Sequence, residues 1–96
     1  MTLGQRQRIF TRNVARLIEF AYDIGFELSF GNTTAPTGLA TSLHPQRLAI
    51  DLNLFRNGKY LRSTRSHEWL GAYWSNLHPR NRWGGEFGDG KHYETR

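Results

Sequence analysis

An alternating pattern between Arg47 and Phe55 limits what this chain can fold into more than any other feature. Every second residue is aliphatic, and in an extended strand these residues share one face: Leu48, Ile50, Leu52 and Leu54. The positions between them face the other way, which places Asp51 opposite the aliphatic side chains. One apolar face needs one covering layer, so the pattern favours a small antiparallel sheet with helices against a single face.

Two segments show the apolar spacing of amphipathic helices, and either could supply that layer. The first is predicted over residues 3–24, with Gly25 where a helix C-terminal glycine belongs. Its apolar stripe consists of Phe10, Val14, Leu17, Ile18 and Ala21. The second is predicted over about residues 65–77, with Thr64 or Ser66 as its cap. Its apolar face consists of Trp69, Leu70, Tyr73, Trp74 and Leu77.

The remaining segments are short strands and turns. Residues 26–30 alternate as a strand that would bury Phe26, Leu28 and Phe30, and Asn57-Gly58 predicts a tight turn before a return strand at Tyr60 and Leu61. We expect loops over residues 31–43 and 80–91, and a last short strand over residues 92–94. The element order predicts one α+β domain spanning residues 1–96.

Composition narrows the chemistry that this domain could perform. The chain has 96 residues and no cysteine, so a metal ion would need His, Asp or Glu ligands. Its net charge of +5 favours anionic partners, namely nucleic acid, anionic lipid or bacterial wall. No uninterrupted apolar segment is present, so we expect synthesis in the cytoplasm without a signal peptide and no stable membrane insertion.

Four residues provide the parts of a catalytic zinc site: His44, Asp51, Asp89 and His92. Such a site uses three protein ligands and leaves one position for water, while a further carboxylate moves protons. Only one of Asp89 and His92 is needed as a ligand, and the other is then the base. Chance occurrence of these spacings is the competing interpretation. We interpret His67 and His78, which have no partnered carboxylate in sequence, as surface residues.

The same residues resemble the signatures of a known family. Ser42-Leu43-His44, followed by Asp51 after six residues, resembles the Ser-x-His-x6-Asp signature of the zinc D-alanyl-D-alanine carboxypeptidases. That group includes VanY-like peptidases, vancomycin-resistance dipeptidases and phage L-alanyl-D-glutamate endolysins. Asp89-Gly90-Lys91-His92 resembles its second signature, and the segment 82–94 is most similar to the phage members. The resemblance covers nearly the whole chain.

The resemblance implies a fold and a set of roles. The fold would be the small antiparallel sheet with flanking helices of Hedgehog and DD-peptidase domains. His44, Asp51 and His92 would be zinc ligands, Asp89 the general base, and Ser42 a substrate-binding residue. Residues 31–41 lack the arginine that family members carry before the first signature. Two interpretations of Arg47 remain: it shares strand-face parity with Asp51 and substitutes for that arginine, or it is a plain surface residue.

Two aromatic residues flank the second signature. We expect Trp83 to fill the core rather than line a cleft, because large aromatic side chains dominate small cores. Tyr93 alternates with its neighbours along the predicted strand, so it should face away from any metal.

The functional prediction is therefore a zinc peptidase that hydrolyses amide bonds of peptidoglycan stem peptides. It would be a phage or prophage lysis enzyme that reaches the host wall after release, acting as a monomer without a nucleic-acid partner. Two alternatives remain. The missing loop arginine favours an inactive, zinc-containing wall-binding module, and the basic first helix favours a small nucleic-acid-binding domain.

Overall fold

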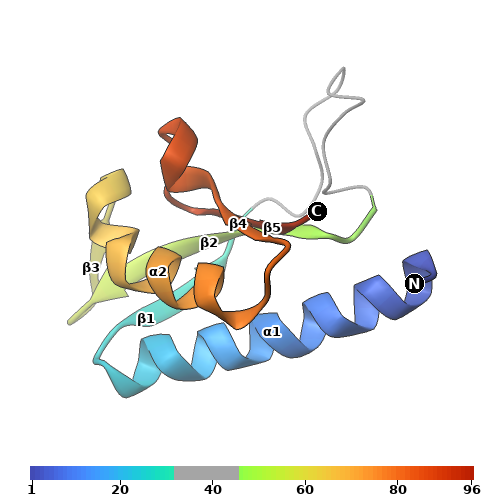
Figure 1. The fold of residues 1–96 in the computed structure, drawn as a ribbon. Coiled ribbons are helices and arrows are strands. Elements are labelled where there is room, and N and C mark those ends of the chain that lie inside the picture. The colour runs from blue at the N-terminus through green and yellow to red at the C-terminus, as the bar shows by residue number, and fades with distance from the viewer. Residues whose placement is uncertain (32–45) are drawn as a thin grey trace.

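The computed structural model describes residues 1–31 and 46–96. It shows an α+β fold in which the helices lie on one side of an antiparallel sheet (Figure 1). In chain order the elements are α1 (Leu3–Asp23), β1 (Glu27–Phe30), β2 (Ala49–Arg56), β3 (Lys59–Leu61), η1 (Thr64–His67), α2 (Glu68–Leu77), β4 (Asn81–Trp83), η2 (Gly84–Phe87) and β5 (His92–Thr95). The predicted fold class is confirmed.

Strand β2 organises the sheet. The strand order is β1-β2-β5-β4, every pairing is antiparallel, and β3 also pairs with β2. The first residues of β2, Ala49 to Asp51, pair with β5, whereas its last residues, Leu54 to Arg56, pair with β3. Strands β3 and β5 therefore follow one another along the same edge of β2, opposite β1.

The core lies between this sheet and the two helices. Its largest fully buried side chains are Trp74, Tyr93, Leu17, Leu48, Leu52, Leu54 and Leu70. The predicted stripe of α1 is confirmed at Phe10, Val14, Leu17 and Ala21, with Ile18 packed against the cluster. At the end of this helix, Gly25 has a φ of 93°, a conformation that glycine adopts without steric cost.

Three local predictions are wrong. Trp69 was expected in the core, but it is 70% exposed, whereas Leu70 and Trp74 of the same helix are fully buried. Ser63, rather than Thr64 or Ser66, supplies the cap by accepting a hydrogen bond from the Ser66 N–H. Phe30 is 65% exposed at the end of β1, so the apolar alternation of that strand does not continue into the core.

The segment predicted as a loop over residues 80–91 contains regular structure. Strand β4 pairs with β5, and η2 follows it directly. The indole Nε1 of Trp74 donates hydrogen bonds to the carbonyl oxygens of Arg82 and Glu94, one on each strand. Contacts from other parts of the chain thus stabilise a three-residue strand, Asn81–Trp83, that the glycine-rich sequence after it does not indicate. Within the described ranges, neither helix has both the length and the apolar character of a membrane span.

Candidate metal-binding site

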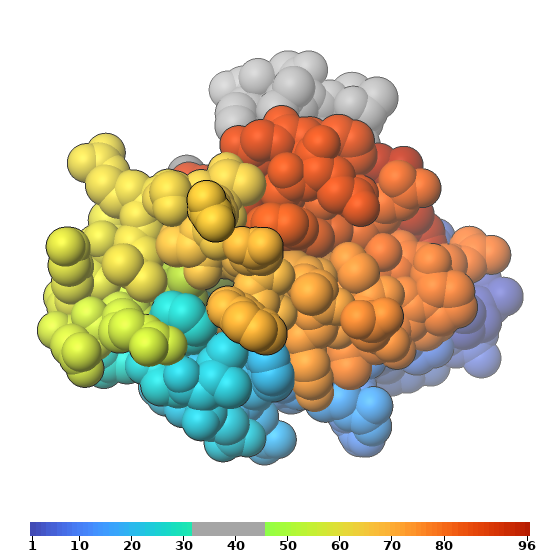
Figure 2. Space-filling model, turned by 60° about the vertical axis from the view of Figure 1, so that its left-hand side comes forward, coloured from blue at the N-terminus to red at the C-terminus, as the bar shows by residue number. Residues whose placement is uncertain are grey.

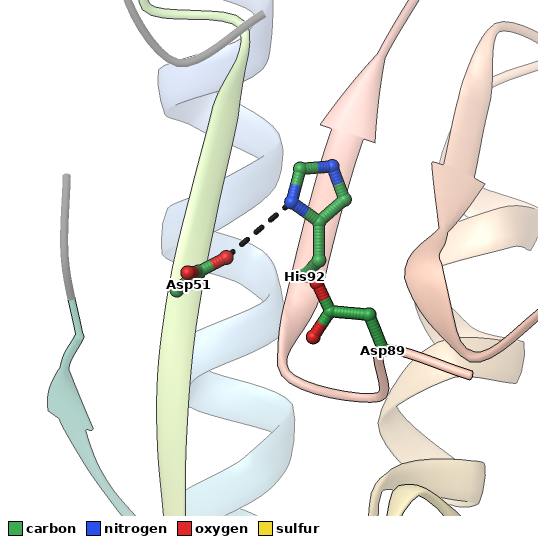
Figure 3. A group of neighbouring side chains, drawn as sticks. All are labelled: Asp51, Asp89 and His92. Atoms are coloured by element: carbon green, nitrogen blue, oxygen red, sulfur yellow. Dashed lines mark hydrogen bonds and ion pairs between the residues drawn. The ribbon is translucent and has the colours of Figure 1, made fainter. Parts of the chain in front are cut away.

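The pairing of β2 with β5 brings Asp51 beside His92. The two residues are direct partners across the antiparallel pair, so their side chains leave the same face of the sheet. The His92 Nδ1 atom lies 3.3 Å from the Asp51 Oδ1 atom (Figure 3). Both side chains are largely covered, with 16% of His92 and 14% of Asp51 exposed.

A turn before β5 adds Asp89 to this pair. The His92 N–H donates to the Asp89 carbonyl at 3.2 Å, which closes a turn over the intervening Gly90 and Lys91. Candidate ligand atoms of Asp51, Asp89 and His92 all lie within 4.8 Å of one another. These three residues could hold a metal ion, and Asp89 is the exposed member of the group.

Glu94 fixes the other side of the His92 ring. It lies two residues further along β5, hence on the same face, and its Oε1 atom is 2.7 Å from His92 Nε2. Its second oxygen accepts a hydrogen bond from Arg96 Nε at 2.8 Å. Glu94 has no role in the prediction from sequence, although its two-residue spacing from His92 on a predicted strand was a usable signal.

This arrangement suits a metal-binding histidine. Histidine ligands commonly donate their second ring N–H to a carboxylate, which fixes the tautomer and the ring orientation. When Nε2 donates to Glu94, a neutral His92 presents an Nδ1 lone pair towards the Asp51 carboxylate. Two electron-rich groups at that distance favour a cation between them, either a proton or a metal ion.

The carboxylates around His92 favour its protonated form. Its hydrogen bond with Asp51 raises the pKa of His92, partial burial lowers it, and Glu94 raises it further, so that the net direction is upward. Burial acts to raise the pKa of Glu94, but hydrogen bonds from Arg96 and His92 outweigh it and lower that pKa. The carboxylates therefore stabilise positive charge at the His92 ring.

Close backbone packing holds the Asp89 turn in place. The Asp89 N–H donates to the Gly84 carbonyl at 2.9 Å. Thr64 Oγ1 donates to the Gly88 carbonyl at 3.1 Å and accepts from the Gly90 N–H at 3.2 Å. The residues on both sides of Asp89 are thus tied to η1, which positions the carboxylate without touching it.

Replacing Gly84 with alanine removes no candidate ligand, but it is expected to displace the backbone that positions Asp89 and His92. A Cβ atom there would collide with the Asp89 carbonyl oxygen and lie 2.7 Å from His92 Cβ, so the turn has to move. Displacing ligands by about 1 Å weakens metal binding, and we expect a loss of about tenfold or more. Calorimetric titration of Gly84→Ala with divalent metal ions measures it. Gly4→Ala, in the first turn of α1, is the matched control and should give the same titration as the wild type.

The other predicted site residues have different outcomes. His44 and Ser42 lie outside the described residues, so their predicted roles stay predictions. Arg47 is not part of β2: it sits in a turn with a φ of 59°, and it lines a surface depression beside Arg8 and Arg12 of α1. The expected strand-face parity between Arg47 and Asp51 is therefore wrong, because the strand begins only at Ala49.

The predictions for the remaining histidines and aromatic residues are partly corrected. His67 is not a surface residue, since it is 3% exposed and its Nδ1 atom lies 2.7 Å from the Tyr93 hydroxyl. His78 is half-buried, and its Nδ1 accepts from the Arg80 N–H. Tyr93 points into the core, away from the candidate ligands, as predicted. Trp83 packs on Gly71 and Gly85.

The fold and this site define a class of protein: an α+β domain whose antiparallel sheet carries, on the side away from its core, a group able to hold a metal ion. A scan against family models finds no match for this chain, and a search of curated proteins finds none either. Function is therefore inferred from the residues themselves.

Proposed function

We propose that this protein is a zinc peptidase that hydrolyses amide bonds in peptidoglycan stem peptides, in the manner of a phage or prophage lysis enzyme. The observation that carries the proposal is the convergence of Asp51, Asp89 and His92. Asp51 lies 38 positions before Asp89 in sequence, and His92 lies three positions after Asp89. The pairing of β2 with β5 nevertheless brings their ligand atoms together. His44 completes the proposed ligand set.

The donor set fits zinc. Imidazole nitrogen and carboxylate oxygen are ordinary zinc ligands, and a catalytic site uses three protein ligands. A bound zinc ion would supply Lewis acidity, lowering the pKa of a water molecule and polarising a substrate carbonyl. Phage L-alanyl-D-glutamate endolysins and D-alanyl-D-alanine carboxypeptidases, which the sequence signatures resemble, use such chemistry on wall peptides.

Asp51 and Asp89 are assigned different roles because they differ in solvent exposure. Asp51 is mostly covered and contacts His92, so it suits a ligand that keeps one position. Asp89 is exposed at the tip of its turn, where water and substrate can reach it. An exposed carboxylate beside the ligands can accept a proton from water and return it to the leaving amine. We therefore assign the general-base role to Asp89.

Charge supports the choice of substrate. The net charge of +5 gives the protein a positive field, which attracts the anionic bacterial wall and raises the rate of encounter. Ser42, two positions before His44, would hold the stem peptide near the ligands, as the resemblance implies.

The decisive experiment is zymography on purified peptidoglycan with and without EDTA. We expect clearing that EDTA abolishes and that added zinc restores, because ligands of this kind lose their metal to a chelator. Identification of the new termini then defines the bond: new amino groups on D-Glu indicate L-alanyl-D-glutamate cleavage, and released D-Ala indicates carboxypeptidase action.

A zinc-loaded protein that binds the wall without clearing it would contradict the peptidase proposal. That outcome would instead support the non-catalytic wall-binding module, which the missing arginine in residues 31–41 favours. Elemental analysis of protein purified without chelator decides whether zinc is present, and about one ion per chain is expected.

A further inference from the structure

The N-terminal half of α1 carries a row of positive charge on its solvent side. Arg8, Arg12 and Arg16 recur every four residues, so each lies about 6 Å along the helix axis from the next, and all three are exposed. Further along the same side the helix carries the exposed Glu19 and Asp23, which confines the positive charge to the N-terminal half. In Figure 2 the first residues of α1, in blue, lie at the opposite end of the molecule from the yellow segment around β3.

A turn from a distant part of the chain adds a fourth arginine to this row. Gln7 Nε2 donates a hydrogen bond to the Gln46 carbonyl oxygen at 2.8 Å, which ties the turn to α1. Arg47 then lines, with Arg8 and Arg12, a depression of about 530 Å³. Figure 1 shows the green segment that enters β2 above this half of the helix. We call the four residues the arginine surface: Arg8, Arg12, Arg16 and Arg47.

This gathering of charge is unfavourable while the surface is empty of anions. Arg47 has a φ of 59°, a left-handed conformation that is costly for a residue with a side chain. Like charges four residues apart on a helix repel each other. Among residues 1–31 and 46–96, no carboxylate forms an ion pair with any member of the arginine surface. A bound polyanion relieves this repulsion, so the arrangement favours one.

The residues around the arginines indicate which polyanion fits. A helix that binds a lipid surface needs a free apolar face, but the apolar stripe of α1 is buried in the core. A site for single-stranded nucleic acid combines positive charge with aromatic side chains on which bases stack. The described lining of the depression has no aromatic residue, and besides the arginines it consists of Gly4, Gln7, Thr11 and Ala15. A row of guanidinium groups among small and polar residues suits a chain of phosphodiesters that has no bases.

We propose that the arginine surface is a docking site for a linear phosphodiester polymer without bases, such as poly(glycerol phosphate). The surface lies on the helix side of the sheet, whereas Asp51 and His92 leave the other face, with α1 behind them in Figure 3. A polymer held by α1 therefore leaves the metal-binding group open. This docking role goes beyond the proposed peptidase function and does not depend on it, because the two share no residue.

Fluorescence anisotropy of end-labelled poly(glycerol phosphate), titrated with the whole chain at several salt concentrations, tests the arginine surface. We expect the logarithm of the binding constant to fall against that of the salt concentration with a slope of about −3, since each neutralised phosphate of a flexible strand contributes about −0.7. The double variant Arg8→Gln and Arg12→Gln should weaken binding by about tenfold to a hundredfold and reduce the slope by about half. Glutamine keeps the helix propensity of arginine, so α1 should be retained.

The matched control removes the same charge elsewhere. The double variant Arg62→Gln and Arg65→Gln neutralises two exposed arginines after β3 and should bind the polymer nearly as tightly as the wild type. Equal loss in both double variants would show that net charge alone is responsible, and would overturn the docking site. Tighter binding of double-stranded DNA, or of vesicles containing phosphatidylglycerol, than of the polymer at equal phosphate concentration would overturn it as well.

Hydrolysis of a soluble stem peptide separates this result from the peptidase proposal. The double variant Arg8→Gln and Arg12→Gln should keep the wild-type kcat/KM on a peptide without phosphate, and a large loss there would overturn the separate docking role. A protein that binds the polymer but hydrolyses no peptide would refute the peptidase and support the docking site. A wild type that hydrolyses the peptide but does not bind the polymer at about 0.15 M salt would overturn the docking site alone.

Discussion

Asp89→Asn is expected to lower peptide hydrolysis by about 10²–10⁴-fold, the usual contribution of a general base. Asparagine has nearly the same shape but cannot accept the proton. The Asp89 backbone contacts, its N–H to Gly84 and its carbonyl to His92, remain available, so the turn should be retained. The measurement is kcat/KM on a soluble stem peptide, together with zinc content and the midpoint of thermal unfolding, both of which should be close to those of wild type.

Two further variants make this result specific. Glu86→Gln neutralises another exposed carboxylate in η2, outside the metal-binding group, and should keep full activity. His44→Ala should lose zinc as well as activity, because we assign His44 to the ligand set. Were Asp89→Asn to lose its zinc while His44→Ala retained it, Asp89 would be the third ligand and the general-base assignment would be wrong.

The second large effect is loss of stability in acid through His67. Burial, and then the positive charge of Lys91, lower the pKa of His67 from 6.5 to about 4. The unfolded chain therefore binds a proton at His67 between about pH 6.5 and pH 4, whereas the folded protein does not. Above pH 6.5 His67 is neutral in both states and its titration does not affect stability. As the pH decreases from 6.5 to 4, the free energy of unfolding falls by up to about 3 kcal/mol.

Urea unfolding at several pH values, in the presence of EDTA, measures this effect. His67→Asn has no titrating ring and should flatten the pH dependence relative to wild type, despite a lower stability at neutral pH. Tyr93→Phe removes the hydroxyl that contacts His67 Nδ1 but leaves the ring buried, so it should keep the loss in acid. An unchanged pH dependence in His67→Asn would show that other groups cause it.

The candidate site was only partly predictable. The spacing of Asp89 and His92 corresponds to a hydrogen-bonded turn, a local structure, and the alternation around Asp51 placed it on the face opposite the aliphatic residues. Asp51 reaches the turn of Asp89 and His92 only through the register of β2 against β5, which no local pattern specifies. Glu94 was missed although its two-residue spacing from His92 was a usable local signal, and its contact also depends on which way the His92 ring points.

Local patterns by themselves determined α1, β2 and the turn at Asn57 and Gly58, because helix and strand periodicities and positive-φ turn residues act over a few positions. Tertiary structure alone decided β4, whose three residues are ordered by β5 and by the Trp74 indole. It also decided the burial of His67 beneath Tyr93 and the exposure of Trp69. Burial depends on which surfaces distant segments present to each other, and that information enters only when the sheet and helices pack.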